Sequence, residues 1–215
     1  MLTHSRHSEK MFVVKIFLSV LILIFSLQSF SKADDIREFE IEGISIGDSL
    51  LKHFSKKSIE DEIRSEFSYK YENSNWVQLG VGSTKDFPLF KKLDNFDELG
   101  ITIKFDDKNY IVHGLIGDVL CHNNIKKCML AKDEIIKDLK SQFVGLNIKS
   151  WKKKHDMDKT GKSIVYGNTL SADTLGFKFS LSVYDMADDR YNDSTQLSIR
   201  TKELENFIRY EAYKN

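Results

Sequence analysis

Apolar and polar residues alternate most strictly near the C-terminal third of the chain, in residues 175–184. One set of alternate positions is apolar and the other mostly polar: Phe177, Phe179, Leu181 and Val183 against Lys178, Ser180, Ser182 and Tyr184. Period-two alternation predicts a strand with one buried face. A sheet with one face open to water is typical of antiparallel pairing, because parallel sheets are covered on both sides.

Shorter apolar runs predict further strands. They lie at residues 39–42, 76–81, 101–105, 110–115, 162–166 and 196–199. The polar sequence Asp106-Asp107-Lys108-Asn109 predicts a hairpin turn between the third and fourth of these.

Helical spacing is strongest at residues 129–143, where apolar residues recur every three or four positions. Asp48 or Ser49 is a suitable cap for an earlier helix, Ser58 for a second one, and Thr201 for a helix at the C-terminus. The order of elements predicts an α+β fold, with an antiparallel or mixed sheet and helices packed on one face.

An internal repeat is a further hypothesis. Ile46-Gly47-Asp48-Ser49-Leu50 recurs as Ile116-Gly117-Asp118-Val119-Leu120, and each copy precedes a Lys-Lys pair and Asp-Glu-Ile. The match favours two related strand–turn–helix units in one sheet. The alternative interpretation is that strands ending in glycine before a capped helix commonly look alike.

The N-terminus resembles a secretory signal peptide. Basic residues precede the apolar run 16–27, and Ser31-Lys32-Ala33 supplies small residues at the −3 and −1 positions. We expect cleavage between Ala33 and Asp34, so that residues 1–33 are the signal and 34–215 one globular domain, periplasmic or secreted. An uncleaved membrane anchor is the alternative, and this segment is the only predicted contact with a membrane.

Charge excludes one class of partner. The chain has 32 basic and 32 acidic residues, whereas nucleic-acid binding requires a basic surplus to replace the counterions around phosphates. We therefore expect no nucleic-acid partner.

The two cysteines predict a disulfide. Cys121 and Cys128 are the only cysteines of the chain, and in an exported protein such a pair commonly forms a bond. A metal site of Cys121, His122 and Cys128 is the alternative, but neighbouring Cys and His rarely direct both side chains to one ion, and no fourth ligand is apparent.

Two acidic clusters contain the ligand types of calcium. Asp156, Asp158 and Thr160 match half of a calcium loop, yet Gly167 stands where a bidentate glutamate is needed, and Lys159 lies within the segment. A solvated turn is favoured over calcium, and no other cofactor is predicted. The second cluster is expected to be a hairpin tip: Asp185, Asp188, Asp189 and Asp193.

The most basic stretch is Lys149-Ser150-Trp151-Lys152-Lys153-Lys154-His155. Trp151 flanked by lysines suits the surface of an anionic membrane, but a solvated loop explains the pattern as well and is favoured.

A resemblance adds to this picture. Residues 39–51, FEIEGISIGDSLL, after a signal peptide resemble the start of a group of small uncharacterised exported proteins from AT-rich marine bacteria. The resemblance implies a bacterial exported protein and no particular activity. More distantly, Ile-Ser-Ile-Gly-x-Ser before a helix is similar to small outer-membrane assembly modules, although those are lipoproteins and this chain has no cysteine before Cys121.

No local motif names a catalytic residue, so whether the chain is an enzyme stays open and a non-enzymatic role is favoured. The favoured function is a binding or envelope-interaction module that displays residues 148–163 and 185–194 to an envelope protein or a small ligand. The alternative is a small periplasmic hydrolase whose site is assembled from distant residues, with Asp185, Asp188 or His113 as participants.

Overall fold

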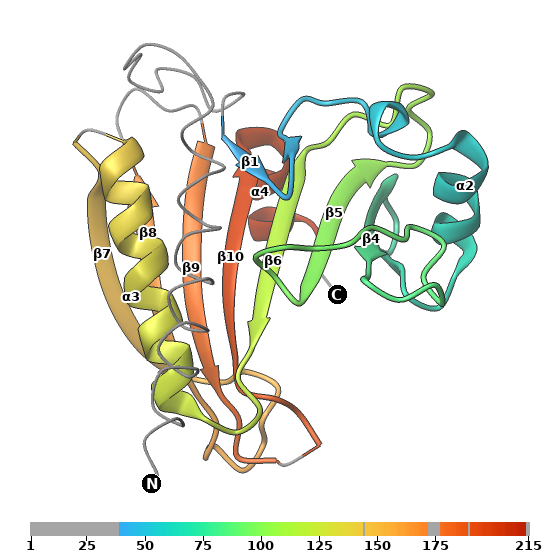
Figure 1. Cartoon of the computed structure of the whole chain (residues 1–215). Helices are drawn as coiled ribbons and strands as arrows, with labels where there is room; N and C mark the ends of the chain where they lie inside the picture. Colours follow the sequence, from blue (N-terminus) through green and yellow to red (C-terminus); the bar gives the residue numbers. More distant parts are fainter. Residues whose placement is uncertain (1–38, 144, 172–176, 189, 214–215) are drawn as a thin grey trace, which may run out of the picture. The chain divides into compact units, whose positions relative to one another are not determined.

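An eight-stranded antiparallel sheet is the centre of the structure, a computed structural model that describes residues 39–143, 145–171, 177–188 and 190–213 (Figure 1). Its strand order is β3-β4-β5-β6-β10-β9-β8-β7. The strands are β3 Tyr69–Lys70, β4 Trp76–Val81, β5 Glu98–Lys104, β6 Gly114–Leu120, β7 Asn147–Lys154, β8 Ile164–Ser171, β9 Phe177–Asp185 and β10 Ser194–Thr201. A separate hairpin contains β1 Glu40–Ile41 and β2 Ile44–Ser45.

Four helical elements accompany the strands in the described residues: the 3-10 turn η2 Leu50–Lys52, and the helices α2 Lys56–Arg64, α3 Ile125–Gln142 and α4 Lys202–Tyr210. Side chains cap each of them. Thr201 accepts a hydrogen bond from Leu204 N at 3.3 Å, which confirms the predicted cap of α4. Ser55 caps α2, so Ser58 lies inside this helix and not at its start.

Two four-stranded meanders make up the sheet. β3 to β6 follow α2 in the sequence, β7 to β10 follow α3, and the last strands of the two halves, β6 and β10, pair at the centre. Ile59 of α2 and Leu139 of α3 are buried in the same core cluster, beside Leu79 and Leu197 of the sheet. This arrangement confirms the predicted α+β class with an antiparallel sheet, and the main core lies on the face covered by α2 and α3.

The other face carries α4 at one end. Leu204 packs above Gly114, where an added Cβ atom would lie 2.6 Å from Leu204 Cδ2. Phe207 and Trp76 pack with a centroid distance of 5.8 Å. On β9 this open face is polar, as the alternation in the sequence predicts: Leu181 is completely buried in the core, whereas Ser180 is half-buried on the open face.

The turn predicted at 106–109 does lie between two antiparallel strands, β5 and β6, but the second strand starts later than predicted. β6 begins only at Gly114, because Tyr110 and Val112 are buried against the turn that follows β2. Gly47 N donates to Val112 O at 2.8 Å, and Val112 N donates to Asp48 O at the same distance. These bonds take residues 110–112 away from β5.

The repeat proposed from residues 46–50 and 116–120 is also not a structural repeat. Residues 46–50 form a turn that enters η2, whereas residues 116–120 lie within β6. The shared sequence reflects similar residue types in two different backbones. The repetition that the structure does contain is one of architecture, a helix followed by a four-stranded meander.

All of the described residues belong to one compact unit within Lys32–Asn215. The predicted signal peptide, with its cleavage site between Ala33 and Asp34, lies outside the described residues. Within the ranges that the structure describes, none of the helices combines the length and apolar character needed to cross a membrane.

Candidate functional site

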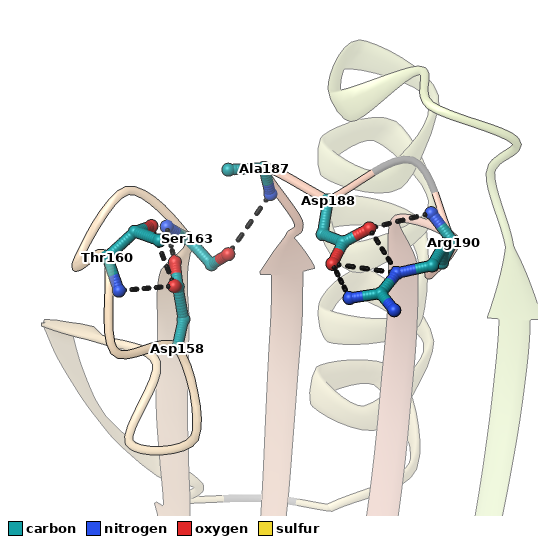
Figure 2. A network of polar contacts seen from close by, with 6 residues as sticks. All are labelled: Asp158, Thr160, Ser163, Ala187, Asp188 and Arg190. Carbon is teal, nitrogen blue, oxygen red and sulfur yellow. Dashed lines mark hydrogen bonds and ion pairs between the residues drawn. The ribbon is translucent and has the colours of Figure 1, made fainter.

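The predicted calcium ligands lie in the loop between β7 and β8. Asp158 Oδ1 accepts hydrogen bonds from Thr160 N at 2.8 Å and Thr160 Oγ1 at 2.7 Å, and its Oδ2 accepts from Ser163 N at 2.7 Å (Figure 2). The Ser163 and Thr160 donors hold the pKa of Asp158 well below its usual range. Asp156 forms an ion pair with Lys153. The oxygen atoms of Asp158 thus face hydrogen-bond donors that shape the loop.

The aspartates of the second acidic cluster also have separate hydrogen-bond partners within the protein. Asp188 accepts hydrogen bonds from Arg190, with Nη2 at 2.6 Å (Figure 2). Asp193 is buried and accepts from Met186 N at 2.8 Å. Burial raises the pKa of Asp185, and the neighbouring Asp193 adds to the effect. Asp189 lies outside the described residues. In the part of the chain that the structure describes, no group of three or more His, Cys, Asp or Glu is placed to hold a metal ion.

Cys121 and Cys128 form the predicted disulfide, with their Cα atoms 5.7 Å apart. The bond joins the end of β6 to the first turn of α3. Its surroundings extend the connection, because Cys121 N donates to Asp193 O at 2.8 Å and Thr195 Oγ1 donates to Cys128 O at 2.9 Å. The corner therefore ties α3 to both central strands, and His122 takes no part in a metal site with the two cysteines.

The residues named for a hydrolase are not brought together. His113 immediately precedes β6, where it contacts the edge of Trp76 and lies 3.7 Å from Glu203 Oε2. Burial lowers its pKa, while Glu203 acts in the opposite direction. Asp185 ends β9, and Asp188 lies in the loop that follows. β6 and β9 run in the same direction, because both pair antiparallel with β10. His113 lies before the start of β6, whereas the two aspartates lie at or after the end of β9. The length of a strand therefore separates His113 from both aspartates.

The basic stretch 149–155 is a strand for most of its length, and its interpretation as a loop is wrong. β7 pairs along its whole length with β8, from Asn147 opposite Ser171 to Lys154 opposite Ile164. Ile148 and Trp151 are its only half-buried residues. The sequence does not reveal this strand, because four of its eight residues are lysines and the usual alternation of apolar and polar residues is missing. In the structure the aliphatic parts of the lysine side chains occupy positions that apolar residues usually fill.

Trp151 is fixed against the open face of the sheet. Its indole lies across Gly167, where an added Cβ atom would be 2.0 Å from Trp151 Cζ2. Its Nε1–H donates to Thr169 Oγ1 at 3.3 Å. The glycine is required for this close approach, and the packed ring is not free to enter a membrane interface.

The outer edge of β7 is open. Among the described residues, β8 is the only strand that pairs with β7, which ends the sheet on this side. Lys153 pairs with Asp156, and Lys152 lies 4.8 Å from the centre of the Tyr166 ring. Lys149 and Lys154 have no ion pair in the described residues. An unpaired edge of eight residues therefore carries a local excess of positive charge.

A half-buried carboxyl group near the centre of the sheet, that of Asp118, was missed in the sequence. Gln196 Nε2 lies 3.2 Å from each carboxylate oxygen of Asp118, and Tyr184 donates to Gln196 Oε1 at 3.3 Å. Burial raises the pKa of Asp118 to about 6, and Glu98 adds to the rise. The three residues come from β6, β10 and β9, so only the strand order brings them together.

Comparisons with known proteins add no relationship to this picture. No family model, no curated protein and no solved structure matches the chain.

Proposed function

We propose that the chain is an exported, non-enzymatic binding protein that pairs the outer edge of β7 with an extended acidic segment of another protein. The observation that carries this proposal is the unpaired, lysine-bearing edge of the eight-stranded sheet. Unpaired N–H and C=O groups of an edge strand bind an added strand through main-chain hydrogen bonds, and side-chain pockets then select the sequence.

Charge selects the kind of partner. Lysine at 149, 152, 153 and 154 gives both sides of the strand a positive charge, because neighbouring side chains point to opposite faces. Glutamate or aspartate opposite these lysines forms cross-strand ion pairs, and each pair stabilises the complex by up to about 1 kcal/mol.

A second copy of the chain is a poor partner. If two β7 strands pair antiparallel about Trp151, Lys149 of one copy lies opposite Lys153 of the other, on the same face of the joined sheet. Like charges directly opposite each other destabilise a pair. Lysine on an edge is a common device against pairing between identical chains. The same lysines leave the edge open to an acidic strand.

An anionic membrane is also less suitable. Membrane binding through this stretch requires an aromatic residue that can reach the interface, and Trp151 is already packed across Gly167.

Export is supported by the disulfide, which persists in oxidising compartments. The N-terminal signal pattern supports it further.

The test is binding of a labelled peptide that alternates glutamate and valine over about ten residues, a length that covers the strand. Protein expressed from the full chain is titrated with this peptide by fluorescence anisotropy. We expect saturable binding that weakens with salt, because exposed charge pairs are screened. Methylation of alternate peptide nitrogens should abolish it by removing the main-chain donors.

A charge-reversal variant locates the site. Lys149→Glu/Lys154→Glu should weaken binding at least about tenfold, which corresponds to about 1.4 kcal/mol. The matched control is Lys126→Glu/Lys137→Glu, which changes the net charge equally through exposed residues of α3. Equal loss in both variants, unchanged affinity after methylation, or binding to anionic vesicles without binding to the peptide would each refute the proposal.

A further inference from the structure

A small pocket opens on the face of the sheet opposite α3, beside α4. Its volume is about 90 Å³, equivalent to roughly three water molecules in the liquid. The floor contains one hydroxyl residue from each of three neighbouring strands, Thr169, Ser180 and Ser198, and the wall contains Arg200, Glu205 and Arg209.

The three hydroxyl residues form one row across the sheet. Thr169 pairs with Ser180, and Ser180 pairs with Ser198, so their side chains lie next to one another on the same face. The indole of Trp151 closes one end of the row through its hydrogen bond to Thr169. Short side chains in this row leave space that longer residues would fill.

Ser198 is the informative member of the row. Its side chain is only 3% exposed, and within the described residues its Oγ atom is buried without a hydrogen-bond partner. Leaving a buried hydroxyl unpaired is unfavourable, and such groups in native proteins are nearly always satisfied. Ser198 is among the residues that line the pocket, so a bound group that reaches its hydroxyl would supply the missing partner.

Two guanidinium groups set the charge of the pocket. Glu205 Oε1 lies 2.9 Å from Arg209 Nη2, and Glu205 Oε2 lies 3.6 Å from Arg200 Nη1. One glutamate thus holds two arginines and neutralises one of them. The remaining charge of +1 and the unused N–H donors of each guanidinium favour a monoanion, since arginine has five donors and binds carboxylates in a fixed geometry.

We infer that this pocket binds the carboxylate group of a small organic acid. One carboxylate oxygen accepts from Ser198 Oγ, and the other faces Arg200. A cation is disfavoured by the two arginines, and a phosphate dianion would need a second positive charge that Glu205 removes. The inference does not depend on the proposed pairing at β7, because none of the lining residues belongs to that strand.

The test is a titration of the 15N-labelled full chain with sodium acetate, followed by NMR, with sodium chloride at equal ionic strength as the reference. We expect saturable shifts at the amides of Ser180, Ser198 and Arg200, with an affinity of roughly millimolar order for so small a ligand. Shifts that sodium chloride reproduces, or tighter binding of inorganic phosphate than of acetate, would overturn the inference.

Two variants separate binding from folding. Ser198→Ala should weaken acetate binding about tenfold by removing a hydrogen bond to a charged group. It should not lower the unfolding midpoint, because the hydroxyl has no partner to lose. Arg200→Gln should weaken binding at least as much. Ser182→Ala is the matched control, a serine on the same face outside the pocket lining, and unchanged affinity in Ser198→Ala or a matching loss in this control would refute the site.

Discussion

The two edges of the eight-stranded sheet end in different ways. At the β4 edge, β3 pairs over only two residues, and beyond it Glu62 of α2 accepts a hydrogen bond from Gly80 N at 3.0 Å. Phe67 and Phe87 stack beside this edge with their centroids 4.4 Å apart. At the other edge, β7 continues for eight residues with no further strand beside it among the described residues.

At the β4 edge, a side chain from α2 thus takes the place of a neighbouring strand as hydrogen-bond partner. Glu62 is completely buried, and a buried carboxyl group is a costly way to satisfy one N–H donor. Within the described ranges no comparable device covers β7, which carries lysines instead. Lysines discourage pairing with an identical strand but attract an acidic one, so we interpret β7 as an edge that is kept available for a partner.

The largest expected effect on stability comes from the disulfide, which anchors α3 above the half of the sheet that ends in β7. Cys121→Ser should lower the free energy of unfolding by about 2–4 kcal/mol, since the bond closes a short loop in the unfolded chain. Urea denaturation without reductant measures the change. The reduced wild-type protein should match the variant, and an unchanged midpoint would show that the bond does not constrain this half.

Asp118 should contribute more to the pH dependence of stability than the charged residues at either edge of the sheet. Its pKa is raised from 3.8 to about 6 by burial, so the folded state retains this proton more strongly than the unfolded state. Its contribution to stability is therefore complete below about pH 4 and is lost as the pH rises through about 6, a change of at most about 3 kcal/mol.

Asp118→Asn tests this contribution, because asparagine keeps an acceptor for Gln196 and cannot ionise. Denaturation midpoints measured from pH 4 to pH 7 should fall less steeply in the variant than in the wild type. Identical slopes would place the titrating group elsewhere.

The closed edge depends on one acceptor. Glu62→Leu should leave Gly80 N–H buried without a partner, whereas Glu62→Gln retains an acceptor oxygen at the same position. We expect the leucine variant to be less stable than the glutamine variant by about 1–3 kcal/mol, the usual cost of an unsatisfied buried donor. Urea denaturation of the pair measures the difference, and equal stability would mean that the edge is closed by α2 and the aromatic rings alone.

The smallest expected effect on stability is at the open edge. Lys149→Gln/Lys154→Gln should change the free energy of unfolding by less than about 0.5 kcal/mol, as exposed substitutions usually do. Sedimentation should nevertheless detect more self-association than in the control Lys126→Gln/Lys137→Gln, because fewer like charges then oppose edge-to-edge pairing. A monomer at all concentrations would show that the lysines do not prevent self-pairing.

Local patterns predicted the elements that depend on local interactions. The alternation of β9, the cap of α4 at Thr201 and the pairing of Cys121 with Cys128 all follow from neighbouring residues and are confirmed. β7 was missed because lysine stems replaced the apolar residues of a strand. The start of β6 was misplaced because Val112 forms its hydrogen bonds with residues near Asp48, far away in the sequence.

The candidate sites depend on strand order, which short-range patterns do not contain. Asp118, Gln196 and Tyr184 meet only because β6 and β9 both pair with β10. The hydroxyl row of Thr169, Ser180 and Ser198 likewise needs β8, β9 and β10 in register. The open edge is recognisable only once β7 is known to be the last strand of the sheet.

Amide hydrogen exchange of the native full chain tests the difference between the two edges most directly. We predict that the β7 amides that do not pair with β8 exchange orders of magnitude faster than the Gly80 amide, since exposed and unpaired N–H groups lack protection. They should slow when the glutamate–valine peptide is added. Exchange as slow as that of Gly80 along the whole of β7 in the free protein would mean that this edge is already covered, and would contradict the account.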